Sequence, residues 1–156
     1  MTITIKFLQD CQEHIPALAK IWYETIRRKW VKEATVKSTI VELMQHAQKD
    51  KLPLAIVALD GNDPIGMACL RDNDGILPEK TPWLGSLAVD PKYRRKKIGE
   101  KLIDEIKSLA KSRKQEKLYL LAFDPTIPTW YSRLGWKHIG HDELLGHPVT
   151  VMSIDL

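Results

Sequence analysis

The most informative segment of the chain reads Val89-Asp90-Pro91-Lys92-Tyr93-Arg94-Arg95-Lys96-Lys97-Ile98-Gly99. An apolar run over residues 81–89 leads into it and has proline near both ends, which is typical of a buried strand. After it, apolar residues repeat at helical spacing from Ile98 to Ala110. The pattern predicts a strand, a cationic turn and a helix N-terminus in series. Because first-turn amides lack intrahelical partners and the helix dipole is positive there, this arrangement favours an anion such as phosphate.

Positive charge is concentrated in this part of the chain. Residues 92–117 contain 11 Lys/Arg and 4 Asp/Glu, whereas the whole chain has a net charge of +4. A basic patch on a mildly acidic remainder suits a small polyanionic ligand better than it suits a protein that coats nucleic acid over its whole surface. The plainer interpretation of such a run is a solvated face or a nonspecific nucleic-acid patch, and it stays open at this point.

Length and composition indicate a single globular domain over residues 1–156. The 156 residues are 44% hydrophobic, enough to bury a core without metal or disulfide support. No apolar stretch approaches the ~20 residues that cross a bilayer, and residues 1–6 alternate like a strand rather than a signal peptide. Cys11 and Cys69 are isolated, which favours neither a disulfide framework nor a zinc site. We therefore expect a cytoplasmic protein with no membrane partner and no metal.

The rest of the chain alternates between strand and helix patterns. Strands are predicted over 2–8, 54–59, 65–71, 81–89, 117–123, 136–140 and 149–154, and helices around 15–26, 40–47, 98–110 and 129–134. Residues 60–64 carry a strong turn signal, which predicts a hairpin, and Thr35 or Ser38 is expected to cap the second helix. The order β-α-α-β-β-β-α-β-α-β-β predicts an α/β fold with a mixed sheet and helices on both faces.

This order and two motifs resemble the GNAT superfamily of acyl-CoA-dependent N-acyltransferases. In the first motif, Arg94 and Gly99 match the family pattern Arg/Gln-x-x-Gly-x-Gly/Ala. The second motif is Trp130-Tyr131-Ser132-Arg133-Leu134-Gly135-Trp136. The resemblance covers essentially the whole chain and implies a mostly antiparallel sheet with a splayed central strand pair. It also implies that acetyl-CoA is the acyl-donor cosubstrate.

The resemblance assigns the coenzyme to the strand and the loop described above. In this family the loop amides hold the pyrophosphate, the strand backbone pairs with the pantetheine arm, and Gly85-Ser86 would mark an irregular point. A backbone N–H at about Leu87 would then polarise the thioester carbonyl. Asp124 stands where the family often has asparagine, although a plain role in opening the next turn is the alternative. The implied cofactor-binding residues are Leu87, Ala88, Val89, Arg94, Arg95, Lys96, Lys97, Ile98, Gly99, Glu100 and Asp124.

Lys97 departs from the family pattern because it stands at the first glycine position of the loop. Glycine there allows close backbone approach or a positive φ, whereas the Cβ of lysine needs room. We expect an ordinary helical backbone at Lys97, with its N–H directed at phosphate and its ammonium adding charge. The alternative is a side chain that simply points into solvent.

Tyr131 aligns with the general acid of the family. Full proton transfer from a tyrosine to a thiolate is uphill by about 2 kcal/mol at ordinary pKa values, so a hydrogen-bond donor that stabilises the departing thiolate is the better description. A purely packing role within the Trp-Tyr pair is the alternative. The sequence does not identify the base that deprotonates the amine. The candidate residues are Asp72, Glu79, Asp124, His138, His141 and His147.

The resulting hypothesis is direct transfer of an acetyl group from acetyl-CoA to a primary amine of a small molecule or of a protein, without metal and without a covalent enzyme intermediate. The missing loop glycine and the absent base favour, as an alternative, a noncatalytic acyl-CoA-binding regulatory domain. A nucleic-acid-binding module over residues 92–117 is a third reading, disfavoured because no exposed aromatic residues interleave the charges there to stack bases. The acceptor is unknown, and association as a homodimer stays open.

Overall fold

The computed structural model describes residues 2–156 and confirms the expected order of strands and helices. The strands are β1 (Ile3–Phe7), β2 (Leu54–Asp60), β3 (Asp63–Arg71), β4 (Trp83–Val89), β5 (Lys117–Ala122), β6 (Lys137–Leu144) and β7 (His147–Asp155). The helices are α1 (Ile15–Trp22), α2 (Arg28–Trp30), α3 (Val36–Met44), α4 (Ile98–Ser112) and α5 (Ile127–Arg133). Short helical turns are η1 (Leu8–Asp10), η2 (Gln12–His14), the π-helical turn η3 (Tyr23–Arg27) and η4 (Pro91–Tyr93).

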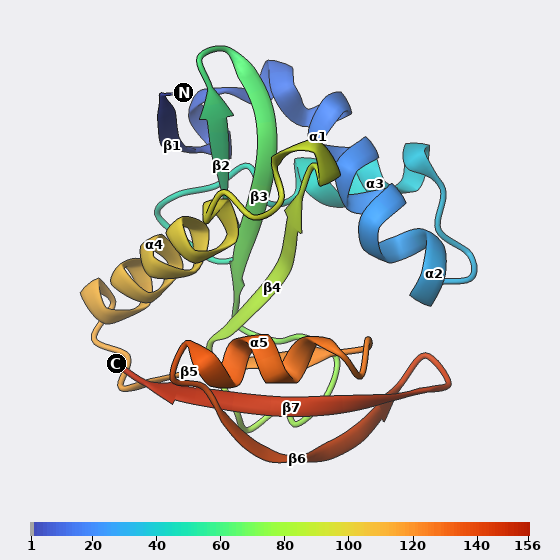
Figure 1. Ribbon diagram of the computed structural model, residues 1–156, viewed down its shortest axis with the longest axis vertical. Helices are drawn as coiled ribbons and strands as arrows, with labels where there is room; N and C mark the ends of the chain where they lie inside the picture. The colour runs from blue at the N-terminus through green and yellow to red at the C-terminus, as the bar shows by residue number, and fades with distance from the viewer. Residues whose placement is uncertain (1) are drawn as a thin grey trace.

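The strands form one open sheet in the order β1-β2-β3-β4-β5-β7-β6. Every neighbouring pair is antiparallel except β4 and β5, which are parallel. Figure 1 shows that β4 runs steeply up the molecule, while β5 and β7 cross beneath it. The sheet is therefore mixed and mostly antiparallel, as predicted, and its two halves meet at the parallel pair.

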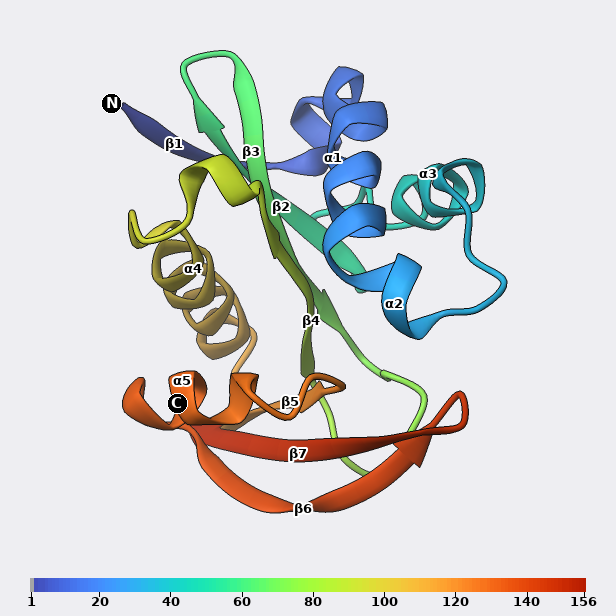
Figure 2. The same cartoon turned by 45° about the vertical axis from the view of Figure 1, so that its right-hand side comes forward.

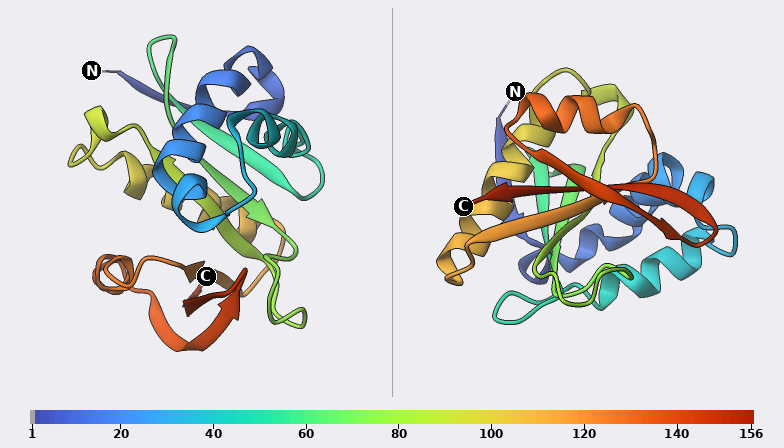
Figure 3. Two further views of the ribbon diagram at one scale, coloured as in Figure 1. Left: turned by 90° about the vertical axis from the view of Figure 1, so that its right-hand side faces the viewer. Right: turned by 90° about the horizontal axis from the view of Figure 1, so that it is seen from below.

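Helices cover both faces of the sheet. Figure 2 shows α4 on one side of β2–β4 and α1 with α3 on the other, and Figure 3 shows the same separation from two further directions. The apolar stripe of α4 packs against β2, β3 and β4, and Tyr131 and Trp136 belong to the same buried cluster. A second cluster joins α1 and α3 to the opposite face of the sheet. This layering confirms the fold class expected from the element order.

Local sequence explains where the helices and turns begin. Thr35 and Ser38 form a reciprocal capping box at the start of α3, so Thr35 is the N-cap. Asp60 pairs with Asp63 at the end of the β2–β3 hairpin, which places Gly61, with its positive φ, in the predicted turn. In α4, the buried side chains are those of the predicted helical repeat: Ile98, Leu102, Ile103, Ile106 and Ala110.

Some boundaries differ from the predictions. The first helical segment runs on through η3 to Trp30, beyond the expected end at residue 26. The hairpin of β6 and β7 is longer than expected, because the exposed β6 has little apolar alternation to mark it. Its turn at Leu145 and Gly146 has positive φ at both residues. These differences extend elements without changing the topology.

Candidate active site

A gap between two strands is the main feature of the sheet centre. β4 and β5 share a single registered pair, Trp83 with Tyr119, and diverge beyond it. In a regular parallel pair, backbone hydrogen bonds continue evenly along both strands. The backbone of β4 after Trp83 therefore lacks regular pairing on its β5 side, as the expected splayed pair requires.

A bulge interrupts β4 at the predicted irregular point. The register between β3 and β4 shifts between Met67 and Cys69, opposite Gly85 and Ala88. Ser86 in the bulge has a φ of +51°, an unusual value for a residue with a Cβ. A bulge re-aims the backbone groups that follow it, so it sets the direction of the amide at Leu87.

The basic loop after β4 is anchored at its start. The Asp90 side chain accepts a hydrogen bond from the Lys92 amide at 3.0 Å and caps η4, and the Asp90 amide donates to the Ile65 carbonyl. The Tyr93 hydroxyl donates to Asp60 at 3.0 Å. The four basic side chains at positions 94–97 are all exposed. The loop is thus anchored at its start and exposes positive charge to solvent.

The expectation of an ordinary helical backbone at Lys97 was wrong. Lys97 is the N-cap of α4 and has φ +62° and ψ +25°, a left-handed conformation, and Arg95 also has a positive φ. The backbone thus keeps the shape that glycine would allow, although lysine occupies the position. A left-handed residue followed by a helical one turns successive N–H groups toward one point, forming an anion-binding concavity. The missing glycine therefore leaves the backbone shape of the loop intact.

Strain at Lys97 leads to a stability prediction. Lys97→Gly and Lys97→Ala remove the same charge, but only glycine also removes the Cβ from a left-handed residue. We expect the glycine variant to unfold with a free energy about 1 kcal/mol higher than the alanine variant. Urea denaturation of both variants measures the difference. Equal stability would show that residue 97 is not left-handed in solution.

The first turn of α4 lies close to α5. The amides of Ile98, Gly99 and Glu100 are in that turn and have no intrahelical acceptor. A Cβ added at Gly99 would lie 3.2 Å from the Trp130 ring, so glycine permits this close approach. The cradle of free amides, positive φ and basic side chains fits a pyrophosphate group.

Tyr131 lies in α5, buried in the cluster that it shares with α4. Its side chain is 7% exposed, and its ring contacts Trp130 and Trp136 in edge-to-face geometry at centroid distances of 4.9 and 5.7 Å. Burial raises the pKa of Tyr131, so the hydroxyl stays protonated across the physiological range. A raised pKa makes full proton transfer less favourable and suits a hydrogen-bond donor.

The Asp124 carboxylate is hydrogen-bonded to a neighbouring residue of the chain. Its Oδ1 accepts hydrogen bonds from the Thr126 amide at 2.9 Å and the Thr126 hydroxyl at 2.7 Å. These bonds lower the pKa of Asp124. The carboxylate therefore opens the turn before α5, which was its alternative role, and a lowered pKa makes it a weak base.

The histidines near the closing strands take two different positions. His138 and His141 stack edge-to-face on β6 with centroids 4.7 Å apart, and both are exposed. His147 lies edge-on to Trp30 and Phe123, which stack on each other with centroids 5.6 Å apart. This aromatic group joins α2 to the ends of β5 and β7. Within residues 2–156, no group of three or more potential metal ligands is arranged around one point.

Sequence reasoning missed a buried polar cluster around Arg71. Arg71 donates from Nε to His46 Nε2 at 2.9 Å and from Nη1 to Asp74 at 3.0 Å, and it also donates to Ser86. These residues line or adjoin a cavity of about 480 Å³ beside Trp22. The only signal in the sequence was an arginine at a strand end followed by polar loop residues, which is also the pattern of an ordinary exposed turn.

His46 makes this cluster sensitive to acid. Burial and the nearby Arg71 lower the pKa of His46 from 6.5 to about 4. The unfolded chain therefore binds more protons than the folded one between these values, and stability falls as pH falls through this window. Going from about pH 7.5 to about pH 5, we expect this group to cost about 2 kcal/mol. Urea unfolding is measured at both pH values for the wild type and for His46→Gln. The variant should lose about 2 kcal/mol less of its free energy of unfolding than the wild type does. An equal loss in the two proteins would contradict the lowered pKa of His46.

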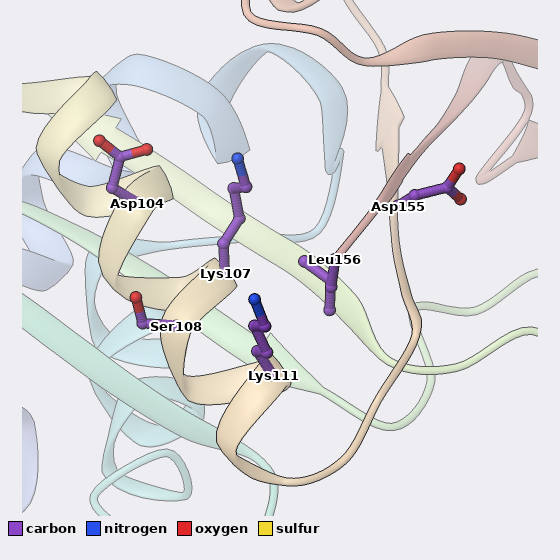
Figure 4. A pocket seen from close by; sticks show the side chains of 6 residues that line it. All are labelled: Asp104, Lys107, Ser108, Lys111, Asp155 and Leu156. Carbon is purple, nitrogen blue, oxygen red and sulfur yellow. The ribbon is translucent and has the colours of Figure 1, made fainter.

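A second hollow lies away from the basic loop. A cavity of about 330 Å³ there is lined by Lys107 and Lys111 of α4 and by the C-terminal residues Asp155 and Leu156. Figure 4 shows Leu156 across from the two lysines, with the carboxylate of Asp155 directed away from them. At helical rise, Lys107 is about 14 Å along α4 from Ile98. Charge at this hollow is therefore separate from charge at the helix N-terminus.

Among the described residues, none of the helices has both the length and the apolar character that crossing a membrane requires.

A splayed parallel pair, a bulge beside it and a basic loop opening a helix together define the class of fold that the sequence resembles. The family model described as "Acetyltransferase (GNAT) family" matches residues 19–136. The chain therefore belongs to the GNAT acetyltransferase family.

Three of the solved structures with this fold match the chain over nearly the whole length of both proteins. An acetyltransferase from Streptococcus agalactiae matches with a TM-score of 0.77 and 19% identity, covering 99% of this chain and 98% of that chain. PaiA N-acetyltransferase from Thermoplasma acidophilum, in complex with coenzyme A, matches with a TM-score of 0.76 and 21% identity, and the match covers 100% of both chains. An aminoglycoside 6'-N-acetyltransferase complexed with coenzyme A matches with a TM-score of 0.69 and 19% identity, and the match covers 99% of this chain and 97% of that chain. At these identities the likeness shows a shared fold. No curated protein matches the chain significantly.

Proposed function

We propose that the protein is an N-acetyltransferase that moves an acetyl group from acetyl-CoA directly to a primary amine. The observation that carries the proposal is the divergence of β4 from β5 after a single registered pair, next to a basic loop at the start of α4. The divergence leaves strand backbone for an extended pantetheine arm, and the loop offers amides and charge to a pyrophosphate. Family membership and two fold relatives solved with coenzyme A support this ligand.

The coenzyme would be held along one continuous path. Leu87, Ala88 and Val89 would offer their backbone to the pantetheine arm, because β4 lacks regular pairing on that side. Residues 94–100 would hold the pyrophosphate through loop and first-turn amides, aided by exposed basic side chains. Asp124, already bonded to Thr126, would border the path at the end of β5 rather than bind phosphate.

Two groups of the chain would act on the reacting atoms. Bound acetyl-CoA supplies an activated acyl group in the form of a thioester. The Leu87 amide would donate a hydrogen bond to the carbonyl oxygen, which strengthens as negative charge develops there. The Tyr131 hydroxyl would donate to the departing sulfur, and its raised pKa keeps that proton in place.

The acceptor amine needs a way to lose its proton. A primary amine with a pKa near 10.4 is almost fully protonated at neutral pH. Asp124 is a weak base here because its pKa is lowered. We propose that this need is met by a water relay, by an amine of lowered pKa or by one of the other candidate bases, which are Asp72, Glu79, His138, His141 and His147.

An acceptor screen tests the proposal. Polyamines, aminoglycosides, amino acids, lysine peptides and peptide N-termini are incubated with acetyl-CoA, and release of coenzyme A thiol is followed, with mass spectrometry of the product. Aminoglycosides belong in the panel because one fold relative is an aminoglycoside 6'-N-acetyltransferase. Acceptor-dependent thiol release with an acetylated amine supports the proposal. Tight acetyl-CoA binding with no transfer across the panel would favour a noncatalytic acyl-CoA-binding domain.

A further inference from the structure

The structure assigns to Arg71 a positioning role: it holds the β4 bulge in the shape that presents the Leu87 amide to the reacting carbonyl. The inference rests on the proposed function, because only an acyl group bound in the gap gives that amide a carbonyl to polarise. Arg71 itself is a positioning residue, since it acts through Ser86 and not on the reacting atoms. Three features of the molecule lead to this role.

The first feature is the bulge itself. Ser86 has a φ of +51°, which is unfavourable for a residue with a Cβ, and it directly precedes Leu87. The register shift between β3 and β4 lies at the same place. A conformation of this kind persists only where surrounding contacts hold it. The side chain of Ser86 supplies such a contact, because its hydroxyl accepts a hydrogen bond from Arg71 Nη2.

The second feature is how firmly Arg71 is fixed. Its side chain is only 16% exposed, and its guanidinium lies 5.7 Å from the centre of the Trp22 ring. Nη1 bonds to Asp74 at 3.0 Å and Nε to His46 at 2.9 Å. The His46 Nδ1 lies 2.9 Å from the Glu42 carbonyl, which can only accept, so Nε2 is the acceptor for Arg71. The guanidinium thus joins the turn after α3, the loop after β3 and the β4 bulge in one fixed geometry.

The third feature is the residue before the bulge. A Cβ at Gly85 would collide with Nη1 of Arg71, so glycine at this position lets the guanidinium cross the strand. Gly85 needs no positive φ, because it is absent from the residues with that conformation. Its lack of a side chain therefore serves the passage of Arg71 toward Ser86. In β4, Gly85 thus leaves room for the Arg71 guanidinium, and Ser86 in the bulge accepts its hydrogen bond.

Arg27 provides a matched control beside the same cavity. Its guanidinium lies 4.9 Å from the centre of the same Trp22 ring, so it is a second cation beside the same cavity. Its buried Nε has no hydrogen-bond partner within residues 2–156. Arg27→Ala therefore removes a nearby positive charge and leaves the Arg71–Ser86 bond in place.

The test is the infrared band of the bound thioester carbonyl. Acetyl-CoA labelled with carbon-13 at the carbonyl is bound to the wild type, Arg71→Ala, Ser86→Ala, Gly85→Ala and Arg27→Ala, and the affinity for plain coenzyme A is measured for each. A polarised carbonyl absorbs at lower wavenumber than the free thioester. Ser86→Ala is the mildest change, since it removes one hydroxyl and keeps the other partners of Arg71. Hydrogen exchange of residues 85–88 in the protein without ligand gives an independent readout.

The inference predicts a lowered wavenumber in the wild type and in Arg27→Ala. The shift is expected to be lost in Arg71→Ala and Gly85→Ala and reduced in Ser86→Ala, with coenzyme A affinity within about twofold and faster amide exchange at 85–88. A full shift in correctly folded Ser86→Ala and Arg71→Ala would overturn the role of Arg71 and leave the proposed function standing. No acetyl-CoA binding, or binding without a shift in the wild type, would overturn the proposed function, and this inference with it.

Discussion

Replacing Tyr131 with phenylalanine is expected to lower kcat roughly 100-fold or more, with acetyl-CoA affinity within about twofold. The hydroxyl is the only atom lost, and burial has raised its pKa, so it is a donor that stays protonated. In the proposed reaction, removing it leaves the departing thiolate without a hydrogen-bond donor. The measurement is steady-state kinetics with the acceptor found in the screen, with acetyl-CoA affinity measured separately by calorimetry.

Tyr119→Phe is the matched control for this experiment. Tyr119 lies on β5, packs on Trp83 with ring centroids 5.7 Å apart and belongs to a different hydrophobic cluster from Tyr131. The control should retain wild-type kcat. If Tyr131→Phe turns over like the wild type, Tyr131 is a packing residue, and the acid role is wrong.

The double variant Arg94→Ala/Lys97→Ala is expected to weaken acetyl-CoA binding roughly 10- to 100-fold, the scale of charge-assisted hydrogen bonds to phosphate. Both side chains are exposed, so the effect should shrink as salt increases. The variant also keeps a Cβ at position 97, which leaves the left-handed backbone unrelieved. Calorimetry at low and high salt measures both effects.

Lys107→Ala/Lys111→Ala removes the same amount of charge from the body of α4, at the distant hollow of Figure 4, and leaves the basic loop intact. Acetyl-CoA affinity should stay near the wild-type value in this control. Equal weakening in both double variants would mean that the overall positive charge of residues 92–117 attracts the ligand and that the loop is not a defined phosphate site.

Local sequence predicted the elements that carry the site. Pro82 and Pro91 bracket β4, and the apolar repeat after Ile98 marks α4, because these signals act within a few residues. The divergence of β4 and β5, in contrast, could not be predicted from local sequence. Nothing in the sequence of β4 or β5 separates them, and this expectation came from the family resemblance.

The features that were missed depend on distant contacts or on rare backbone shapes. Lys97 is left-handed at the start of α4, and lysine gives no sign of a positive φ as glycine does. Arg71 meets His46 and Ser86 from 25 and 15 residues away along the chain. Arg71 and His46, taken alone, each have the pattern of a polar residue at the end of a strand or helix, and nothing in the sequence pairs Ser86 with either of them. Only the fold brings them together.

Acetyl-CoA binding is best measured by a calorimetric titration into the wild-type protein, because this experiment needs no knowledge of the acceptor. We expect saturable binding at one site per chain, competed by coenzyme A, because the proposed contacts of the loop and the β4 backbone are to parts that both molecules share. Absence of saturable binding would contradict the proposed coenzyme site. It would leave the family fold in place and direct attention to nucleic acid as the ligand of the basic loop.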